Sequence, residues 1–147
     1  MGDARYDPTT NRMVRTDAPA GIQNVRTRFT VAQINAGATL LPAVPGFTYR
    51  LTGLRMIPIG GAVTGLTALV ILGTRAAGAV TLVSAAAAAL TQSTPVRYDS
   101  ANVTILADGA SFTPLDANTA VTVGKTGGNA ATATHVDVFA DYVLEAA

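Results

Sequence analysis

The sequence predicts an all-β protein, a jelly-roll-like β-sandwich of about eight strands with an extended N-terminal arm. Short runs rich in Val, Ile and Thr recur along the chain, and several alternate apolar with polar residues. Clusters of Gly, Pro, Asn and Asp separate these runs. One alanine run is the single candidate for a helix, and no internal repeat is evident. Strands joined by long as well as short loops suit a jelly roll.

Composition excludes several classes of function. The chain has 147 residues, of which 49% are hydrophobic and only 13% charged, and its net charge is +1. This balance excludes a broad electrostatic footprint for nucleic acid and a polybasic membrane anchor. The chain has no cysteine, which excludes disulfides, thiolate zinc sites and cysteine nucleophiles. The polar start of the chain predicts no secretory signal.

Two parts are expected along the chain, an arm over residues 1–24 and a single sandwich domain over residues 25–147. The arm contains glycines, prolines and scattered charges without any hydrophobic period. Such a segment is often disordered by itself. Two alternatives stay open: a loose terminus, or a segment that becomes ordered on a partner surface.

The first strands of the domain are predicted from alternation. Residues 25–34 alternate with Val, Thr and Phe on one face and arginines on the other, and residues 36–46 form a short strand ended by proline and glycine. Residues 47–57 alternate as well, but the phase shifts by one residue at Gly53, after which Arg55 faces outward. A shift of one residue at a glycine predicts a β-bulge.

Residues 56–74 form an uncharged stretch of nineteen residues, nearly the length of a membrane-spanning helix. The stretch holds four glycines and a proline, and no aromatic belt or lysine cluster flanks it. Its second half is a short β-branched run that ends in Gly-Thr. We therefore predict a strand that is apolar on both faces instead of a membrane span.

A strand that is apolar on both faces needs cover on each side. Alternation places Leu69 and Ile71 on the face opposite Val70 and Leu72. Either a segment of the same chain covers the second face, or another subunit does. On the second alternative, Leu69 and Ile71 would lie in an interface.

Further strands are expected at residues 78–85, 102–107 and 119–124, with a glycine-rich loop over residues 125–132. The alanine run at 84–90 is too short to be helical alone. A single helical turn and a strand that faces a tight neighbour both stay open there, and a short helical turn or a loop crossing is favoured. The clearest strand of all is the last, residues 134–144. Its alternation separates an apolar face from a face that carries His135, Asp137, Phe139 and Asp141.

No constellation predicts catalysis or a metal. His135, the only histidine, is two residues from Asp137, but Asp141 lies about 13 Å further along an extended strand. One such pair is weak for any metal, so we expect a solvated or interface-facing edge there. The nucleophile motif Gly-x-Ser-x-Gly is missing, and Lys125 lies in the expected glycine-rich loop. We therefore expect no enzyme activity, no cofactor and no metal.

The basic residues favour protein contact. Nine of the ten basic residues are arginines. In the arm, the negative charges of three aspartates nearly balance the positive charges of the arginines. Arginine forms bidentate pairs with carboxylates and is enriched at interfaces. The candidate interface residues, with a protein partner or with another subunit, are Arg5, Arg12, Arg15, Ile22, Arg26, Arg28, Leu69, Ile71 and Phe139.

The chain resembles the β-rich head decoration (cement) proteins of tailed bacteriophages over about residues 30–145. The shared idiom is Asn-Ala-Gly-Ala at 35–38, followed by Leu-Pro-Ala-Val-Pro-Gly at 41–46. Pro-Leu-x-Ala-Asn-Thr follows at 114–119, then a glycine-rich loop and an alternating strand that ends near Tyr142. The resemblance is one of style and order, and the arm matches nothing comparable.

The resemblance implies a structural virion protein on the outer surface of a phage capsid, made in the host cytoplasm. It implies major capsid protein and other copies of this chain as partners, in a trimer or a dimer, with no nucleic acid or membrane bound. It carries over no catalytic residue. The alternative within virions is a tail, fibre or baseplate adaptor that binds glycans, which the absence of Trp disfavours. A cupin-like enzyme would need more than one histidine.

Overall fold

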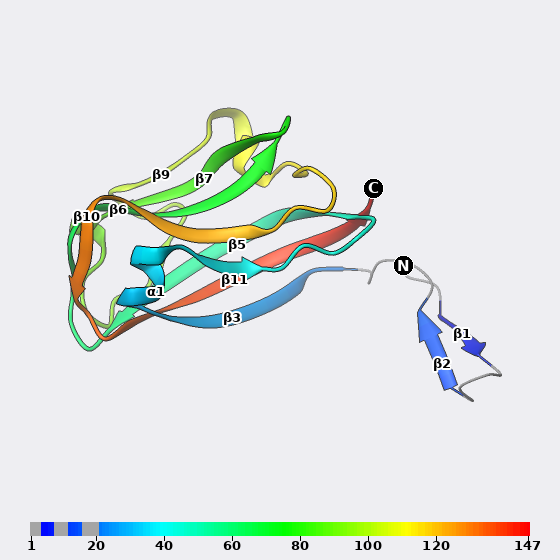
Figure 1. Cartoon of the computed structure of the whole chain (residues 1–147), viewed down its shortest axis with the longest axis horizontal. Helices are drawn as coiled ribbons and strands as arrows, with labels where there is room; N and C mark the ends of the chain where they lie inside the picture. The colour runs from blue at the N-terminus through cyan, green and yellow to red at the C-terminus, as the bar shows by residue number, and fades with distance from the viewer. Residues whose placement is uncertain (1–3, 8–11, 16–20) are drawn as a thin grey trace.

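The protein is an all-β sandwich of two antiparallel sheets, as expected. A computed structural model describes the backbone of residues 4–7 and 12–15 and all of residues 21–147. One sheet has four strands in the order β3-β11-β5-β8, and the other has five in the order β4-β10-β6-β7-β9. Figure 1 shows the two sheets as two layers that enclose the core.

The strands vary in length from two to thirteen residues. The four-stranded sheet contains β3 (Gln23–Thr30), β5 (Phe47–Ile59), β8 (Val96–Arg97) and β11 (His135–Ala146). The five-stranded sheet contains β4 (Ala38–Leu41), β6 (Val63–Arg75), β7 (Gly78–Ala86), β9 (Val103–Ile105) and β10 (Val121–Thr132). Strands β1 (Ala4–Asp7) and β2 (Arg12–Arg15) precede them.

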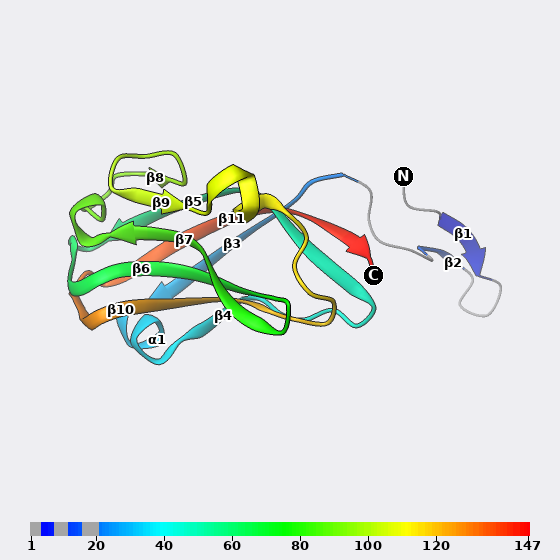
Figure 2. The same cartoon turned by 90° about the horizontal axis from the view of Figure 1, so that it is seen from above.

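The strand order is that of a jelly roll. Without the edge strand β9, the eight sandwich strands fall into two sheets of four in which chain-order positions run 1-8-3-6 and 2-7-4-5. The last strand, β11, therefore lies between β3 and β5, as Figure 2 shows from above. β11 is therefore a central strand, and its side chains lie beside side chains of both neighbouring strands.

The core lies between the sheets and is built by alternation. On β11, Val136, Val138 and Ala140 are fully buried in the core, as the sequence predicts. The shift at Gly53 is also confirmed, because Asp141 pairs with Gly53 whereas Tyr142 pairs with Leu51. Thr52 is the extra residue of this bulge. The bulge keeps β5 apolar side chains in the core and turns Arg55 outward.

The interface predicted for Leu69 and Ile71 is wrong. Both side chains are 0% exposed and belong to the core of this chain. Val70 and Leu72 alternate with these residues along β6 and therefore lie on its opposite face. Gly124 of β10 lies on that same face, because a Cβ atom there would touch the Val70 and Leu72 side chains. The four-stranded sheet of the same chain thus covers Leu69 and Ile71.

No described helix is long and apolar enough to cross a membrane.

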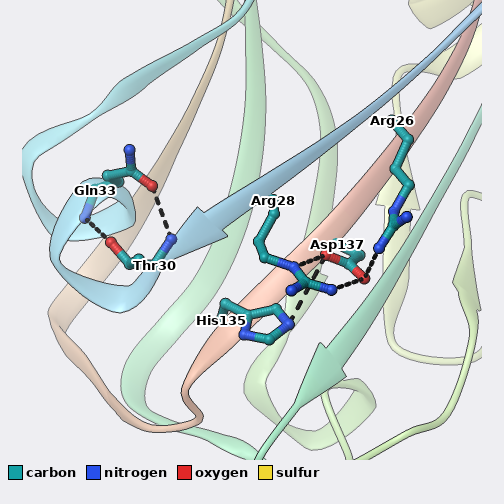
Figure 3. Close-up of polar contacts among 6 residues, drawn as sticks. All are labelled: Arg26, Arg28, Thr30, Gln33, His135 and Asp137. Carbon is teal, nitrogen blue, oxygen red and sulfur yellow. Dashed lines mark hydrogen bonds and ion pairs between the residues drawn. The ribbon is translucent and has the colours of Figure 1, made fainter.

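A short helix, α1 (Val31–Ala36), begins where the sequence predicted the first strand to continue. Thr30 caps it: its hydroxyl accepts from Gln33 N at 3.2 Å, and Gln33 Oε1 accepts from Thr30 N at 2.8 Å, as drawn in Figure 3. This capping box ends β3 and turns the chain. Ile34 of α1 is fully buried. Two 3-10 segments complete the helical content described, η1 (Ala87–Ala89) and η2 (Ala107–Phe112).

The predicted glycine-rich loop at 125–132 is wrong as well, since these residues extend β10. The pairing with β6 shifts twice there, around Gly127. Side chains at Gly65 or Gly127 would collide with the facing strand, so the glycines permit close approach of two backbones. Both alternatives left open for the alanine run occur, because β7 continues to Ala86 and the helical turn η1 follows it.

The expected arm over residues 1–24 contains a hairpin in its described part. β1 and β2 pair antiparallel with each other and belong to neither sheet. The rest of the arm up to residue 20 lies outside the described residues, as do the side chains of Arg5, Arg12 and Arg15. The sandwich itself begins at Gln23, two residues before the predicted boundary.

Candidate functional site

The outer surface of the four-stranded sheet gathers charged and aromatic side chains from four strands. Cross-strand pairing places Arg26, Phe139 and Arg55 in one row, and Arg97 lies next to Arg55. Arg28 pairs with Asp137 in the adjacent row. We call this surface the arginine face, which comprises Arg26, Arg28, Arg55, Arg97, His135, Asp137, Phe139 and Asp141. Its four arginines exceed its two aspartates, so the face is net positive.

Asp137 holds the two arginines of β3 in place. Its Oδ2 atom accepts from Arg26 Nη2 at 3.1 Å, and its Oδ1 atom accepts from Arg28 Nε at 3.0 Å. A longer bond of 3.4 Å from Arg28 Nη2 makes the Arg28 contact bidentate (Figure 3). The Asp137 side chain is only 9% exposed, whereas both arginine side chains are more than half exposed. The carboxylate therefore lies beneath the guanidinium groups.

The contact shifts both pKa values in the direction of a stable ion pair. Hydrogen bonding from Arg28 lowers the pKa of the Asp137 carboxyl, and Arg26 lowers it further, although burial opposes the shift. The same bond raises the pKa of Arg28. One carboxylate faces two arginines, so this cluster keeps a positive charge at neutral pH.

His135 lies beside this cluster without joining it. Its Nε2 atom is 3.9 Å from Asp137 Oδ1, beyond hydrogen-bond distance, and finds no partner among residues 21–147. The side chain is 12% exposed. Within the described part of the chain, no group of three or more histidine, aspartate or glutamate residues comes close enough to hold a metal. A solvated or interface-facing edge was expected at His135 and Asp137; their low exposure contradicts the solvated alternative, and the interface-facing alternative stays a prediction.

Phe139 separates two arginines. The Arg55 guanidinium carbon lies 4.8 Å from the centre of the ring, and that of Arg26 lies 5.9 Å from it. Both distances fall in the range of cation–π attraction, which contributes about 0.5–1 kcal/mol at exposed sites. The ring thus orients Arg55, which faces no carboxylate at ion-pair distance among residues 21–147.

A depression of about 260 Å³ opens at the β5–β8 side of the face. Its lining includes Gly53, Arg55, Arg97, Phe139 and Asp141. Asp141 also accepts a hydrogen bond from the Asn24 side chain. The depression therefore offers two guanidinium groups, an aromatic ring and a carboxylate to one ligand.

Three predicted interface residues, Arg26, Arg28 and Phe139, come together on this face. Ile22, directly before β3, is 65% exposed, which agrees with its prediction as a contact residue without testing it. Sequence reasoning missed Arg55 and Arg97 as members of the site. The outward phase of Arg55 was readable, but β8 has only two residues and gives no periodic signal.

The outer surface of the five-stranded sheet is of a different kind. Its central row contains Gly124, Val70 and Ser84, and the next contains Thr122 and Leu72. These side chains are small or apolar and carry no charge. The sandwich therefore presents one charged and one uncharged broad face.

Comparison with protein-family models, with curated proteins and with solved structures finds no match to this chain.

Proposed function

We propose that this protein is a structural virion component that binds the outer surface of a phage capsid and stabilises the shell by protein–protein contacts. The observation that carries the proposal is the arginine face, where Asp137 and Phe139 hold half-exposed arginines in defined positions. The sequence resemblance to decoration proteins supplies the partner, the major capsid protein.

Arginine and aromatic side chains suit such a contact. Both are enriched at protein interfaces and among the residues that dominate binding energy. A guanidinium group that is already oriented loses less side-chain entropy on binding than a free one. The carboxylate of Asp137 and the ring of Phe139 provide this orientation before any partner arrives.

The uncharged face suits contact between copies of this chain. On the outward face of β6, Val70 is only 3% exposed, whereas Leu72 is partly exposed and replaces Leu69 and Ile71 as the candidate for a subunit interface. The homo-oligomer, a trimer or a dimer, stays a proposal. Sedimentation at micromolar concentration tests it, and a monomer at every concentration contradicts it.

Binding to particles tests the capsid assignment. Purified chain is mixed with particles that are built of the major capsid protein and lack this chain, and binding is measured by co-sedimentation. We expect saturable binding that the Arg55→Ala substitution weakens tenfold or more, about 1.4 kcal/mol. Arg75→Ala serves as the control, because Arg75 hydrogen-bonds carbonyl groups of Thr113 and Pro114 and lies outside the arginine face. Binding to tails and not to capsids would favour the adaptor alternative.

A further inference from the structure

Two arginines of the arginine face are direct cross-strand neighbours. Arg55 on β5 pairs with Arg97 on β8. Tyr98 N donates to Leu54 O in the preceding pair, so Arg55 and Arg97 form the non-hydrogen-bonded pair, in which side chains lie closest. Like charges directly opposite each other destabilise a sheet. A bound anion would relieve this repulsion.

The other described arginines already have partners. Asp137 binds Arg26 and Arg28, and Arg50 lies 3.2 Å from Glu145. Among residues 21–147, no carboxylate lies within ion-pair distance of Arg55 or Arg97. Both line the depression, so their free N–H donors border a concave site.

A second charge lies at a defined spacing from this pair. Asp141 pairs with Gly53, two residues along β5 from Arg55. Two residues of a strand span about 7 Å, so the positive row and Asp141 are separated by one side-chain repeat of an extended chain. Asp141 accepts one bond from Asn24 and retains free lone pairs.

We propose that the depression binds an extended segment of the protein partner through an acidic side chain, with a lysine or arginine two residues away. The acidic carboxylate lies between Arg55 and Arg97, and the basic side chain reaches Asp141. A guanidinium group matches a carboxylate geometrically. The carboxylate of Asp141, which lines the depression, disfavours a polyanion such as nucleic acid. The assignment rests on the proposed function, whose partner it describes chemically.

Peptides test the site without any particle. The probes are acetylated, amidated pentapeptides, Thr-Glu-Thr-Lys-Thr and its matched control Thr-Gln-Thr-Lys-Thr. Nuclear magnetic resonance follows the arginine Nε–Hε signals during titration. We expect saturable shifts at Arg55 and Arg97 with the glutamate peptide and at least tenfold weaker binding of the glutamine peptide.

Variants assign the effect to the site. The Arg97→Gln substitution should weaken binding of the glutamate peptide at least tenfold, whereas Arg75→Gln should leave it unchanged. Asp141→Asn should weaken the binding of Thr-Glu-Thr-Lys-Thr. It should leave unchanged the binding of Thr-Glu-Thr-Gln-Thr, which has no lysine. Circular dichroism confirms that each variant keeps the β fold.

Each of the following outcomes would overturn the proposal: equal binding of both peptides, shifts spread over all arginines, no effect of Arg97→Gln, or tighter binding of inorganic phosphate than of the glutamate peptide. Acetate is the control for binding of a carboxylate without a peptide. An affinity for acetate equal to that for the glutamate peptide would also overturn the proposal. Selective peptide binding by a chain that fails to bind particles would contradict the capsid assignment alone.

Discussion

At the scale of single residues, Asp137 organises the arginine face. It is a buried carboxylate on the outward side of a strand, and two arginines of the neighbouring strand cover it. A carboxylate in this position needs its partners, because burial alone would favour its neutral form. The arginines in turn gain fixed orientations while their outer surfaces remain accessible.

Replacement of Asp137 by Asn should lower the stability at neutral pH by about 1.5–3 kcal/mol, the range for hydrogen bonds to charged groups. The pKa of the Asp137 carboxyl is lowered from its ordinary value of 3.8. The native protein therefore gains stability from this group above that value and loses it as pH falls through 3.8 towards the lowered pKa.

Denaturant unfolding of wild type and the Asp137→Asn variant between pH 7 and pH 2 measures this effect. The stability difference should be constant at neutral pH and shrink below pH 4. Asp99→Asn, at an exposed position in the turn after β8, is the control and should leave the stability unchanged at neutral and at acidic pH. A difference that stays constant down to pH 2 would contradict the proposed ion pair.

At the scale of elements, strand β6 shows why an apolar strand does not by itself indicate a subunit interface. Both of its faces are covered or shielded in its central part, where Leu69 and Ile71 face the core and Val70 lies between neighbouring strands. Alternation divides the residues correctly into two faces. It does not reveal which face the second sheet covers, because that depends on long-range pairing.

Leu69→Ala should destabilise the protein by about 2–5 kcal/mol, because it removes a fully buried side chain and leaves a cavity. Thr67→Ala, two residues earlier and exposed, should have an effect within about 0.5 kcal/mol. Thermal or denaturant unfolding of both variants measures the difference. Equal small effects would place Leu69 outside the core.

Several elements were predictable because their signals are local. The alternation of the last strand and the phase shift at Gly53 gave correct faces and a correct bulge. The helix α1 was missed although Thr30 and Gln33 carry the sequence pattern of a capping box. The extension of β10 was not predictable locally, because its glycines are typical of a loop. Strand β8 was not predictable either, because two residues give no alternation. The site was half predictable for the same reason: Arg26, Arg28 and Phe139 lie on long alternating strands, whereas Arg97 does not.

At the scale of the whole molecule, the jelly roll separates two surfaces with different chemistry. The last strand enters between β3 and β5 and brings Phe139 and Asp137 among the arginines. The opposite sheet presents an uncharged surface. This difference between the two surfaces underlies the proposed contacts with a charged partner on one face and with a copy of this chain on the other.

Deletion of residues 1–20 should leave the sandwich folded, because β1 and β2 pair with neither sheet. We expect an unchanged far-ultraviolet circular dichroism minimum and a similar melting temperature. Particle binding should weaken tenfold or more, about 1.4 kcal/mol, if this segment contacts the shell. Unchanged affinity would show that the segment takes no part in binding.

The most direct measurement is a cryo-electron microscopy reconstruction of capsid particles incubated with the purified chain. We expect ordered density for the sandwich on the outer surface of the shell, with the arginine face directed towards the major capsid protein. Arg55 and Arg97 should lie within hydrogen-bond distance of an acidic side chain of that protein. Particles without added density at saturating concentration, or a bound sandwich whose arginine face points to solvent, would contradict it.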